Sequence, residues 1–159
     1  MRILFVCMGN ICRSPTAEAI FRDKLAKAGL LEKVFVDSAG TGDWHVGKPP
    51  DPRSVREGAR RGYDLSGLRA RQVTPEDFYS FDLILAMDHE NIVFLSELRP
   101  SNSTAQVDLL LQRYGSQVSE VPDPYFGGDA GFTHVIDLLE KACDELVHEV
   151  RRRLESGSA

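Results

Sequence analysis

The sequence predicts an α/β fold in which a parallel sheet carries helices on both faces. Short apolar runs typical of buried strands alternate with segments whose apolar residues recur at helical spacing. No internal repeat and no low-complexity linker interrupts this alternation. The chain of 159 residues is long enough to bury a sizeable core. We therefore expect residues 1–159 to form a single domain.

The N-terminal part of the chain predicts a strand, a helix and a second strand. The run from Ile3 to Val6 is continuously apolar, as expected of a strand buried on both faces. Ser14 is a good N-cap residue and Pro15 suits the first helical turn, so a helix is expected to begin there and to end at Gly29. A second short strand is expected from Val34 to Asp37.

The middle of the chain predicts a long loop, two helices and a third strand. Residues Ala39 to Pro50 are rich in Gly and Pro, which is typical of a loop. A helix is expected from Asp51 to about Arg61, and a single helical turn is expected at Thr74 to Asp77. The apolar run Leu83 to Ala86 predicts the third strand.

The C-terminal part predicts two more helices and a fourth strand. Helical spacing of apolar residues indicates a helix over Asp88 to Leu98. Val107 to Leu111 fits a strand, although a helix is also possible because Leu has no strong β preference. A second Gly- and Pro-rich loop is expected at Val121 to Gly131. The clearest helix is the last one, over Phe132 to Val150.

Charge and composition exclude several classes of partner. The chain has 24 acidic and 19 basic residues and a net charge of -5, which argues against nonspecific binding to nucleic acid or to an anionic membrane. No apolar run reaches the length of about 20 residues that spans a bilayer. The N-terminal segment has no signal-type cleavage region, so we expect a cytoplasmic protein.

The three cysteines indicate neither a disulfide framework nor a metal site. Three cysteines, Cys7, Cys12 and Cys143, are too few for a disulfide framework. No later Cys-x-x-Cys or His-x-x-x-His completes a zinc site. We expect no metal and no cofactor. Cys143 lies on the apolar face of the last helix and is expected to be a core residue.

The segment from Cys7 to Ser14 is the strongest candidate for chemistry. It joins the first strand to the start of a helix, whose free backbone N–H groups and partial positive charge favour an oxyanion. Gly9 and Asn10 tolerate left-handed backbone angles, so this loop can curl with its amides inward and hold a phosphate. The same field favours the thiolate of Cys7, and Arg13 can bind two phosphate oxygens at once. A thiolate beneath such a phosphate is placed for attack at phosphorus.

The stretch from Val6 to Pro15 resembles the signature loop of the low-molecular-weight protein tyrosine phosphatases. Further segments resemble the family in the same order along nearly the whole chain. These segments are Asp37 to Thr41, Trp44 to Gly47, Ala70 to Gln72, Leu85 to Asp88 and Asp123 to Tyr125. The resemblance implies a four-stranded parallel sheet with a phosphate-binding loop after the first strand. It also implies a cysteinyl-phosphate intermediate and no metal.

The resemblance also implies roles for individual residues. Cys7 corresponds to the nucleophile, Arg13 to the phosphate ligand and Asp123 to the general acid and base. Ser14 corresponds to the hydroxyl that bonds the thiolate, and Asn10 to the residue that holds the loop with support from Ser38. The substrate is expected to contact Met8, Gly9, Asn10, Ile11, Cys12 and Ser14 in the loop and Trp44, Tyr125 and Phe126 in the walls of a slot.

Some positions remain open at this level. The acid role of Asp123 has support from the sequence itself, because Pro122 and Pro124 stiffen the loop around it. Cys12 fits two interpretations equally, a disulfide partner of oxidised Cys7, as the resemblance implies, or a small packing residue. The chain has Leu68 where family members often carry a His, so support of the loop from that side is expected to differ.

The arginines of the expected helix 51–61 also allow two interpretations. They are Arg53, Arg56, Arg60 and Arg61. They could attract a phosphorylated partner, but a solvated helix face is the favoured interpretation.

The predicted reaction is hydrolysis of phosphotyrosine in proteins. We expect a monomer whose partners are phosphotyrosine proteins, including a tyrosine kinase or its targets. Protein-arginine phosphatase is the nearest alternative, but a branched apolar Ile11 suits a phenyl ring better than a guanidinium. A thioredoxin-coupled arsenate reductase would need a further cysteine pair, and residues 80–100 contain none. A noncatalytic phosphate-binding module is disfavoured because nucleophile, Arg and acid are all present.

Overall fold

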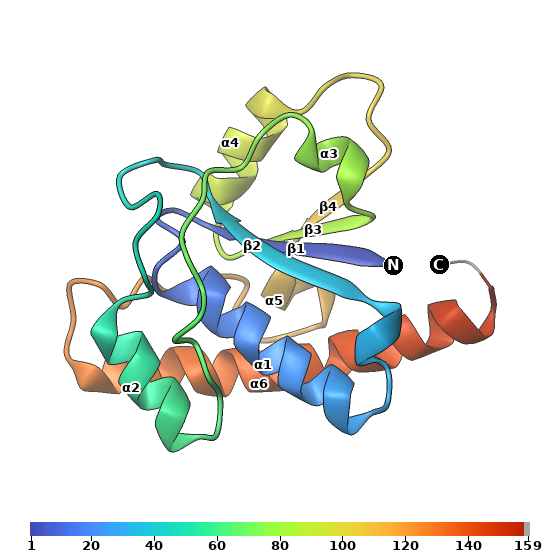
Figure 1. Ribbon diagram of the computed structural model, residues 1–159. Coiled ribbons are helices and arrows are strands. Elements are labelled where there is room, and N and C mark those ends of the chain that lie inside the picture. The colour runs from blue at the N-terminus through green and yellow to red at the C-terminus, as the bar shows by residue number, and fades with distance from the viewer. Residues whose placement is uncertain (158–159) are drawn as a thin grey trace.

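The sheet has four parallel strands, which confirms the predicted fold class. The computed structural model describes residues 1–157 and orders the strands β2-β1-β3-β4 (Figure 1). Their bounds are β1 Arg2–Cys7, β2 Phe35–Gly40, β3 Leu83–Ala86 and β4 Gln106–Leu109. The chain runs from β1 to β2 on one side and reaches β3 on the other, so the carboxyl end of β1 is the point at which ligands bind in folds of this kind.

Helices cover both faces of the sheet (Figure 1). One face carries α1 (Arg13–Lys27), α2 (Pro52–Arg60), the short α5 (Leu110–Arg113) and the long α6 (Asp129–Glu155). The other face carries α3 (Asp77–Ser80) and α4 (His89–Leu98), and the 3₁₀ turn η1 (Leu31–Lys33) precedes β2. Both layers are needed because the central strands are apolar on both faces.

Alternating side chains of β1 enter two separate cores. Ile3, Phe5 and Cys7 belong to the core beneath α1 and α6, whereas Leu4 and Val6 belong to the core on the side of α3 and α4. Cys7 therefore points toward α1. The last residue of β1 is thereby aimed at the N-terminus of the helix that follows it.

Several element boundaries differ from the prediction. The expected fourth strand ends at Leu109, since its partner β3 ends at the paired residue Ala86, and the chain then turns into α5. Both interpretations of residues 107–111 are thus correct for part of the segment. β2 extends to Gly40 because it pairs with β1 as far as Cys7, and α6 begins at Asp129 rather than at Phe132. Acidic residues favour the first turn of a helix, and Asp129 occupies that position. Within residues 1–157, no helix is long and apolar enough to cross a membrane.

Candidate active site

The loop between β1 and α1 is curled by a close backbone approach and by one left-handed residue. Asn10 has a φ of 57°, a conformation that Asn tolerates better than most residues. Gly40 lies directly beside the loop, and a Cβ at this position would be 2.7 Å from the carbonyl oxygen of Met8. Backbone N–H groups of Gly42 and Asp51 donate to the carbonyls of Met8 and Ile11 at 2.9 and 2.8 Å. These contacts fix the loop from the outside.

Two polar groups contact the sulfur of Cys7. The hydroxyl of Ser14 lies 3.0 Å from Sγ, and the backbone N–H of Asn10 donates to Sγ at 3.3 Å. The N-cap position of α1 is Cys12, with no side-chain cap, so the expectation that Ser14 caps the helix is wrong. Ser14 lies within the first turn of α1, and its hydroxyl is directed toward Cys7. The first amides of α1 are left without a side-chain acceptor, as an anion site requires.

Asn10 connects the loop to the rest of the site. Its Nδ2 donates to Ser14 Oγ at 2.8 Å and to Ser38 Oγ at 3.0 Å. Its Oδ1 accepts the backbone N–H of Arg71 at 3.0 Å. Support on that side of the loop therefore comes from the main chain of Arg71, whereas Leu68 packs against the core.

Arg13 is buried and is not a solvated helix residue. Its Nη1 donates to Asp88 Oδ2 at 2.6 Å and to the carbonyl of Val121 at 3.0 Å, and Nη2 lies 3.8 Å from Asp123 Oδ2. Burial opposes its charge, but the neighbouring Cys7 and Asp88 outweigh this effect and raise the pKa of Arg13. The guanidinium is thus a fixed positive charge beside the sulfur. Nη1 is fully engaged, and Nε and Nη2 are left for phosphate oxygens.

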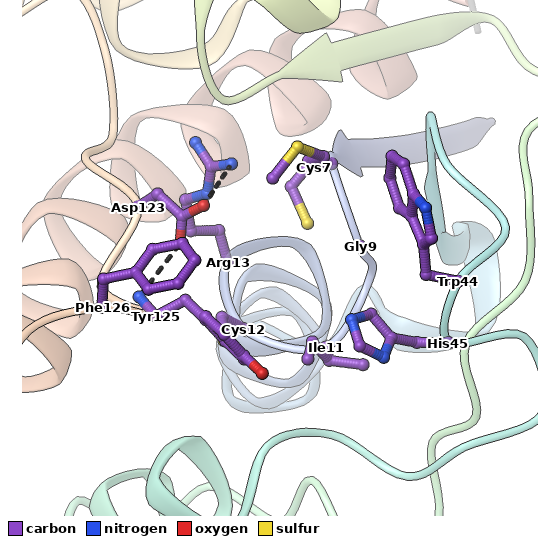
Figure 2. Close-up of a pocket in the computed structure, with 11 residues that line it drawn as sticks. Cys7, Gly9, Ile11, Cys12, Arg13, Trp44, His45, Asp123, Tyr125 and Phe126 are labelled. Atoms are coloured by element: carbon purple, nitrogen blue, oxygen red, sulfur yellow. Dashed lines mark hydrogen bonds and ion pairs between the residues drawn. The ribbon is translucent and has the colours of Figure 1, made fainter.

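Asp123 lies at the mouth of the site on the loop before α6. Its Oδ1 accepts the backbone N–H of Tyr125 at 3.0 Å, which fixes the carboxylate in a tight turn. Its side chain is 32 % exposed, so water reaches its carboxylate. Figure 2 shows Asp123 and Arg13 on one side of Cys7, with Trp44 and His45 on the opposite side.

Ten of the predicted site residues line one cavity of about 260 Å³. They are Cys7, Met8, Gly9, Ile11, Cys12, Arg13, Trp44, Asp123, Tyr125 and Phe126 (Figure 2). Asn10 and Ser14 were expected to contact substrate but do not line this cavity, because their side chains are buried behind Cys7 in the hydrogen-bond network. Trp44 and Phe126 are 67 % and 90 % exposed, so they stand at the rim and are not core anchors.

The other cysteines are neutral thiols. Burial and the nearby carboxylate of Asp51 raise the pKa of Cys12 to about 12. Burial likewise raises the pKa of Cys143, which lies in the core as predicted.

Three features of the site were missed by sequence reasoning. His45 lines the cavity next to Trp44, and a Cβ on Gly9 would lie 3.0 Å from its ring. Asp88 holds Arg13, and its position two residues after β3, at the same sheet edge, was the available signal. Arg53 was expected on a solvated face, which is wrong, because it donates to the carbonyls of Tyr125 and Gly127 in the loop of Asp123.

The comparison with known proteins settles the family. The family model for low molecular weight phosphotyrosine protein phosphatases matches residues 2–156. The chain belongs to this family. It is 44 % identical to a low molecular weight protein-tyrosine-phosphatase of Bacillus subtilis, covering 94 % of this chain and 96 % of the relative. It is 40 % identical to the human low molecular weight phosphotyrosine protein phosphatase, covering 89 % and 90 %.

Solved structures agree with the sequence comparison. A protein tyrosine phosphatase of Entamoeba histolytica is similar with a TM-score of 0.90 and 41 % identity, over 100 % of this chain and 99 % of that one. An arginine phosphatase of Drosophila is also similar, with a TM-score of 0.87 and 35 % identity over 94 % and 98 % of the two chains. This chain is accordingly a hydrolase of the low molecular weight protein-tyrosine phosphatase family.

Proposed function

We propose that this enzyme hydrolyses phosphotyrosine in proteins in two steps, with Cys7 as the nucleophile. The observation that carries the proposal is the placement of Cys7 Sγ. It lies at the floor of an aromatic-lined cavity, 3.0 Å from a serine hydroxyl and beside the uncapped N-terminus of α1. Both features stabilise a thiolate and the phosphate that it attacks.

In the first step the Cys7 thiolate attacks phosphorus and the bond from phosphorus to the phenol oxygen breaks. Loop amides and Arg13 bind the three remaining phosphate oxygens, and Asp88 holds the guanidinium in place. Asp123 gives its proton to the departing phenol oxygen, so that no phenolate is released. The products are tyrosine and a phosphate ester of Cys7.

In the second step water attacks the phosphorus of that ester. Asp123, now a carboxylate, takes a proton from the water, and the sulfur departs as a thiolate. The Ser14 hydroxyl donates a hydrogen bond to the departing sulfur. Inorganic phosphate leaves and Asp123 is protonated again.

The shape of the cavity favours a phenyl ring over a guanidinium. Ile11 and Tyr125 form part of the lining and Trp44 stands at the rim, so the groups that would surround the ring of a substrate are largely apolar and aromatic. An arginine side chain would bring several N–H donors against these apolar groups, where few of the donors would find an acceptor, which is costly. Phosphotyrosine is therefore the proposed substrate, although an arginine phosphatase is among the similar structures.

The remaining elements of the proposal concern the setting of the reaction. We propose that residues 1–159 act as a single domain and a monomer in the cytoplasm, without metal or cofactor. The partners are phosphotyrosine proteins, including a tyrosine kinase or its targets. The net charge of -5 supports the proposal that neither nucleic acid nor a membrane surface is a partner.

The experiment that tests the proposal measures hydrolysis of phenyl phosphates with graded leaving-group pKa. Cys7→Ser is expected to abolish turnover, because a serine hydroxyl is hardly ionised at neutral pH. Asp123→Asn is expected to slow hydrolysis of phenyl phosphates whose phenols have a high pKa by about 10²–10⁴-fold. Hydrolysis of nitrophenyl phosphates is expected to slow much less. EDTA is expected to leave the rate of the wild-type enzyme unchanged for both classes of substrate.

Asp129→Asn is the matched control for the acid. It makes the same change in a carboxylate at the other end of the loop, where Asp129 contacts Arg56. If Asp123→Asn keeps the leaving-group dependence of the wild type, Asp123 is not the acid. Full activity of Cys7→Ser would overturn the whole mechanism.

A further inference from the structure

A buried carboxylate that the mechanism does not use lies beneath the Cys7 loop. Glu18 is one helical turn after Ser14 in α1, and only 2 % of its surface is exposed. Its Oε2 lies 2.8 Å from Arg22 Nη2, and its Oε1 accepts the hydroxyl of Ser38 at 2.7 Å. Burying a charged group is costly, so a carboxylate at this position needs an explanation.

The direction of each hydrogen bond in this region follows from the available donors and acceptors. The backbone N–H of Arg71 can only donate, so the atom of Asn10 that faces it must be Oδ1. The Nδ2 group of Asn10 then faces both serines and donates one hydrogen to each. Both hydroxyl oxygens are therefore acceptors toward Asn10.

Each serine has one remaining hydrogen to donate. The hydroxyl of Ser38 donates to Glu18 Oε1, because a carboxylate can only accept. The hydroxyl of Ser14 has two acceptors within reach, Cys7 Sγ at 3.0 Å and the carbonyl of Ala39 at 3.4 Å. The shorter contact directs this hydrogen to the sulfur. A continuous path of oriented bonds therefore runs from Glu18 through Ser38, Asn10 and Ser14 to Cys7.

We infer that Glu18 is a positioning residue for the nucleophile: its carboxylate holds Ser38, Ser38 holds Asn10, and Asn10 sets both donors that stabilise the Cys7 thiolate. Those donors are the Ser14 hydroxyl and the backbone N–H of Asn10 itself. Asn10 also has a left-handed backbone, which is strained and needs side-chain support. This inference rests on the proposed role of Cys7 as nucleophile.

Glu18 influences the pH at which Cys7 ionises in two opposite ways, through the hydrogen-bonded path and through its charge. A negative charge near a thiolate disfavours the thiolate, so its removal would lower the pH at which Cys7 ionises. Loss of the two positioned donors would raise that pH. The charged groups facing Glu18 are Arg22, Asp37 and Arg71, and burial raises the pKa of Glu18 while Ser38, Arg22 and Arg71 oppose the rise.

The test is the pH dependence of Cys7 alkylation by iodoacetate in the full chain, followed by loss of activity. Glu18→Gln is expected to raise the midpoint of this dependence by about half a unit to one unit, since a bond to a neutral amide replaces one to a carboxylate. Glu57→Gln is the matched control, because Glu57 is also buried and paired with an arginine but lies on α2. It is expected to leave the midpoint unchanged.

Two further variants separate positioning from a general loss of structure. Glu18→Asp keeps the charge but withdraws the carboxylate from Ser38, and it is expected to raise the midpoint as well. When Ser38 is already replaced by alanine, Glu18→Gln is expected to cause no further rise in the midpoint, because the hydrogen-bonded path is already broken. Circular dichroism and inhibition by inorganic phosphate report whether each variant is folded and binds an oxyanion.

The inference is overturned if Glu18→Gln lowers the midpoint or leaves it unchanged, or if its effect is as large with Ser38→Ala as without it. Those outcomes leave the proposed function intact as long as wild-type Cys7 is alkylated with loss of activity. If alkylation of Cys7 does not reduce turnover, the proposed function fails instead. The two failures are therefore distinguishable in one data set.

Discussion

Replacing Trp44 with alanine tests whether the exposed rim recognises the aromatic ring of the substrate. Trp44 is 67 % exposed. Because a tryptophan has a contact area of up to about 250 Å², about 170 Å² of it is free to contact a ligand. If a phenyl ring covers about a quarter of that area, burial stabilises binding by about 1 kcal/mol. Stacking adds about 0.5–1 kcal/mol. We expect Trp44→Ala to lower kcat/KM for aryl phosphates by about 10–30-fold.

The assay compares kcat/KM for phenyl phosphates with that for a small alkyl phosphate. The alkyl substrate is expected to be affected little, because it has no ring to stack. Tyr79→Ala is the control for trimming an exposed aromatic residue, since Tyr79 is 54 % exposed and lies on α3. If Trp44→Ala retains the full preference for aryl substrates, Trp44 does not recognise the ring, and Tyr125 and Phe126 are the remaining candidates.

Three further predictions concern groups around the sulfur. Asp88→Asn is expected to lower kcat/KM and to weaken inhibition by phosphate by about tenfold or more, because it removes the charged partner of Arg13 Nη1. The helix α4 is expected to persist, since an amide can still cap it. An unchanged inhibition constant for phosphate would contradict this role of Asp88. Because burial and Asp51 raise the pKa of Cys12 to about 12, iodoacetate at neutral pH is expected to label Cys7 and spare Cys12 in peptide mapping. After mild peroxide, Cys12→Ser is expected to recover less activity with a thiol reductant than the wild type, and equal recovery would reject a protective disulfide.

The sequence predicts those parts of the site that depend on local order in the chain. A strand ending in Cys7, a loop containing Gly9 and Asn10, and a helix beginning near Arg13 are contiguous, so their residue types already indicate an oxyanion site. Asp123 was identified from its two neighbouring prolines and from the family resemblance. The position of Trp44 at the rim is consistent with its place in a long loop.

The missed parts of the site are contacts between segments that are distant in the chain. Asp88 follows β3, and its contact with Arg13 joins residues 75 positions apart. Arg53 reaches the loop of Asp123 across 72 positions, a contact that its neighbours on α2 do not indicate. The position of Glu18 in α1 does not indicate its partner, because the serine that it accepts from is on β2. The spacing of apolar residues shows which face of a helix is buried, but it does not show which distant polar group each polar side chain contacts.

The proposed mechanism requires that the phosphoryl group is transferred to the sulfur of Cys7, and detection of the resulting phosphate ester tests this step. The wild-type enzyme is mixed with an aryl phosphate, quenched in acid within the first turnover and examined by mass spectrometry of intact protein and peptides. We expect one phosphoryl group on the peptide that contains Cys7, and none in Cys7→Ser. Phosphate on another residue, or full turnover with no phosphate on Cys7, would show that Cys7 is not the nucleophile.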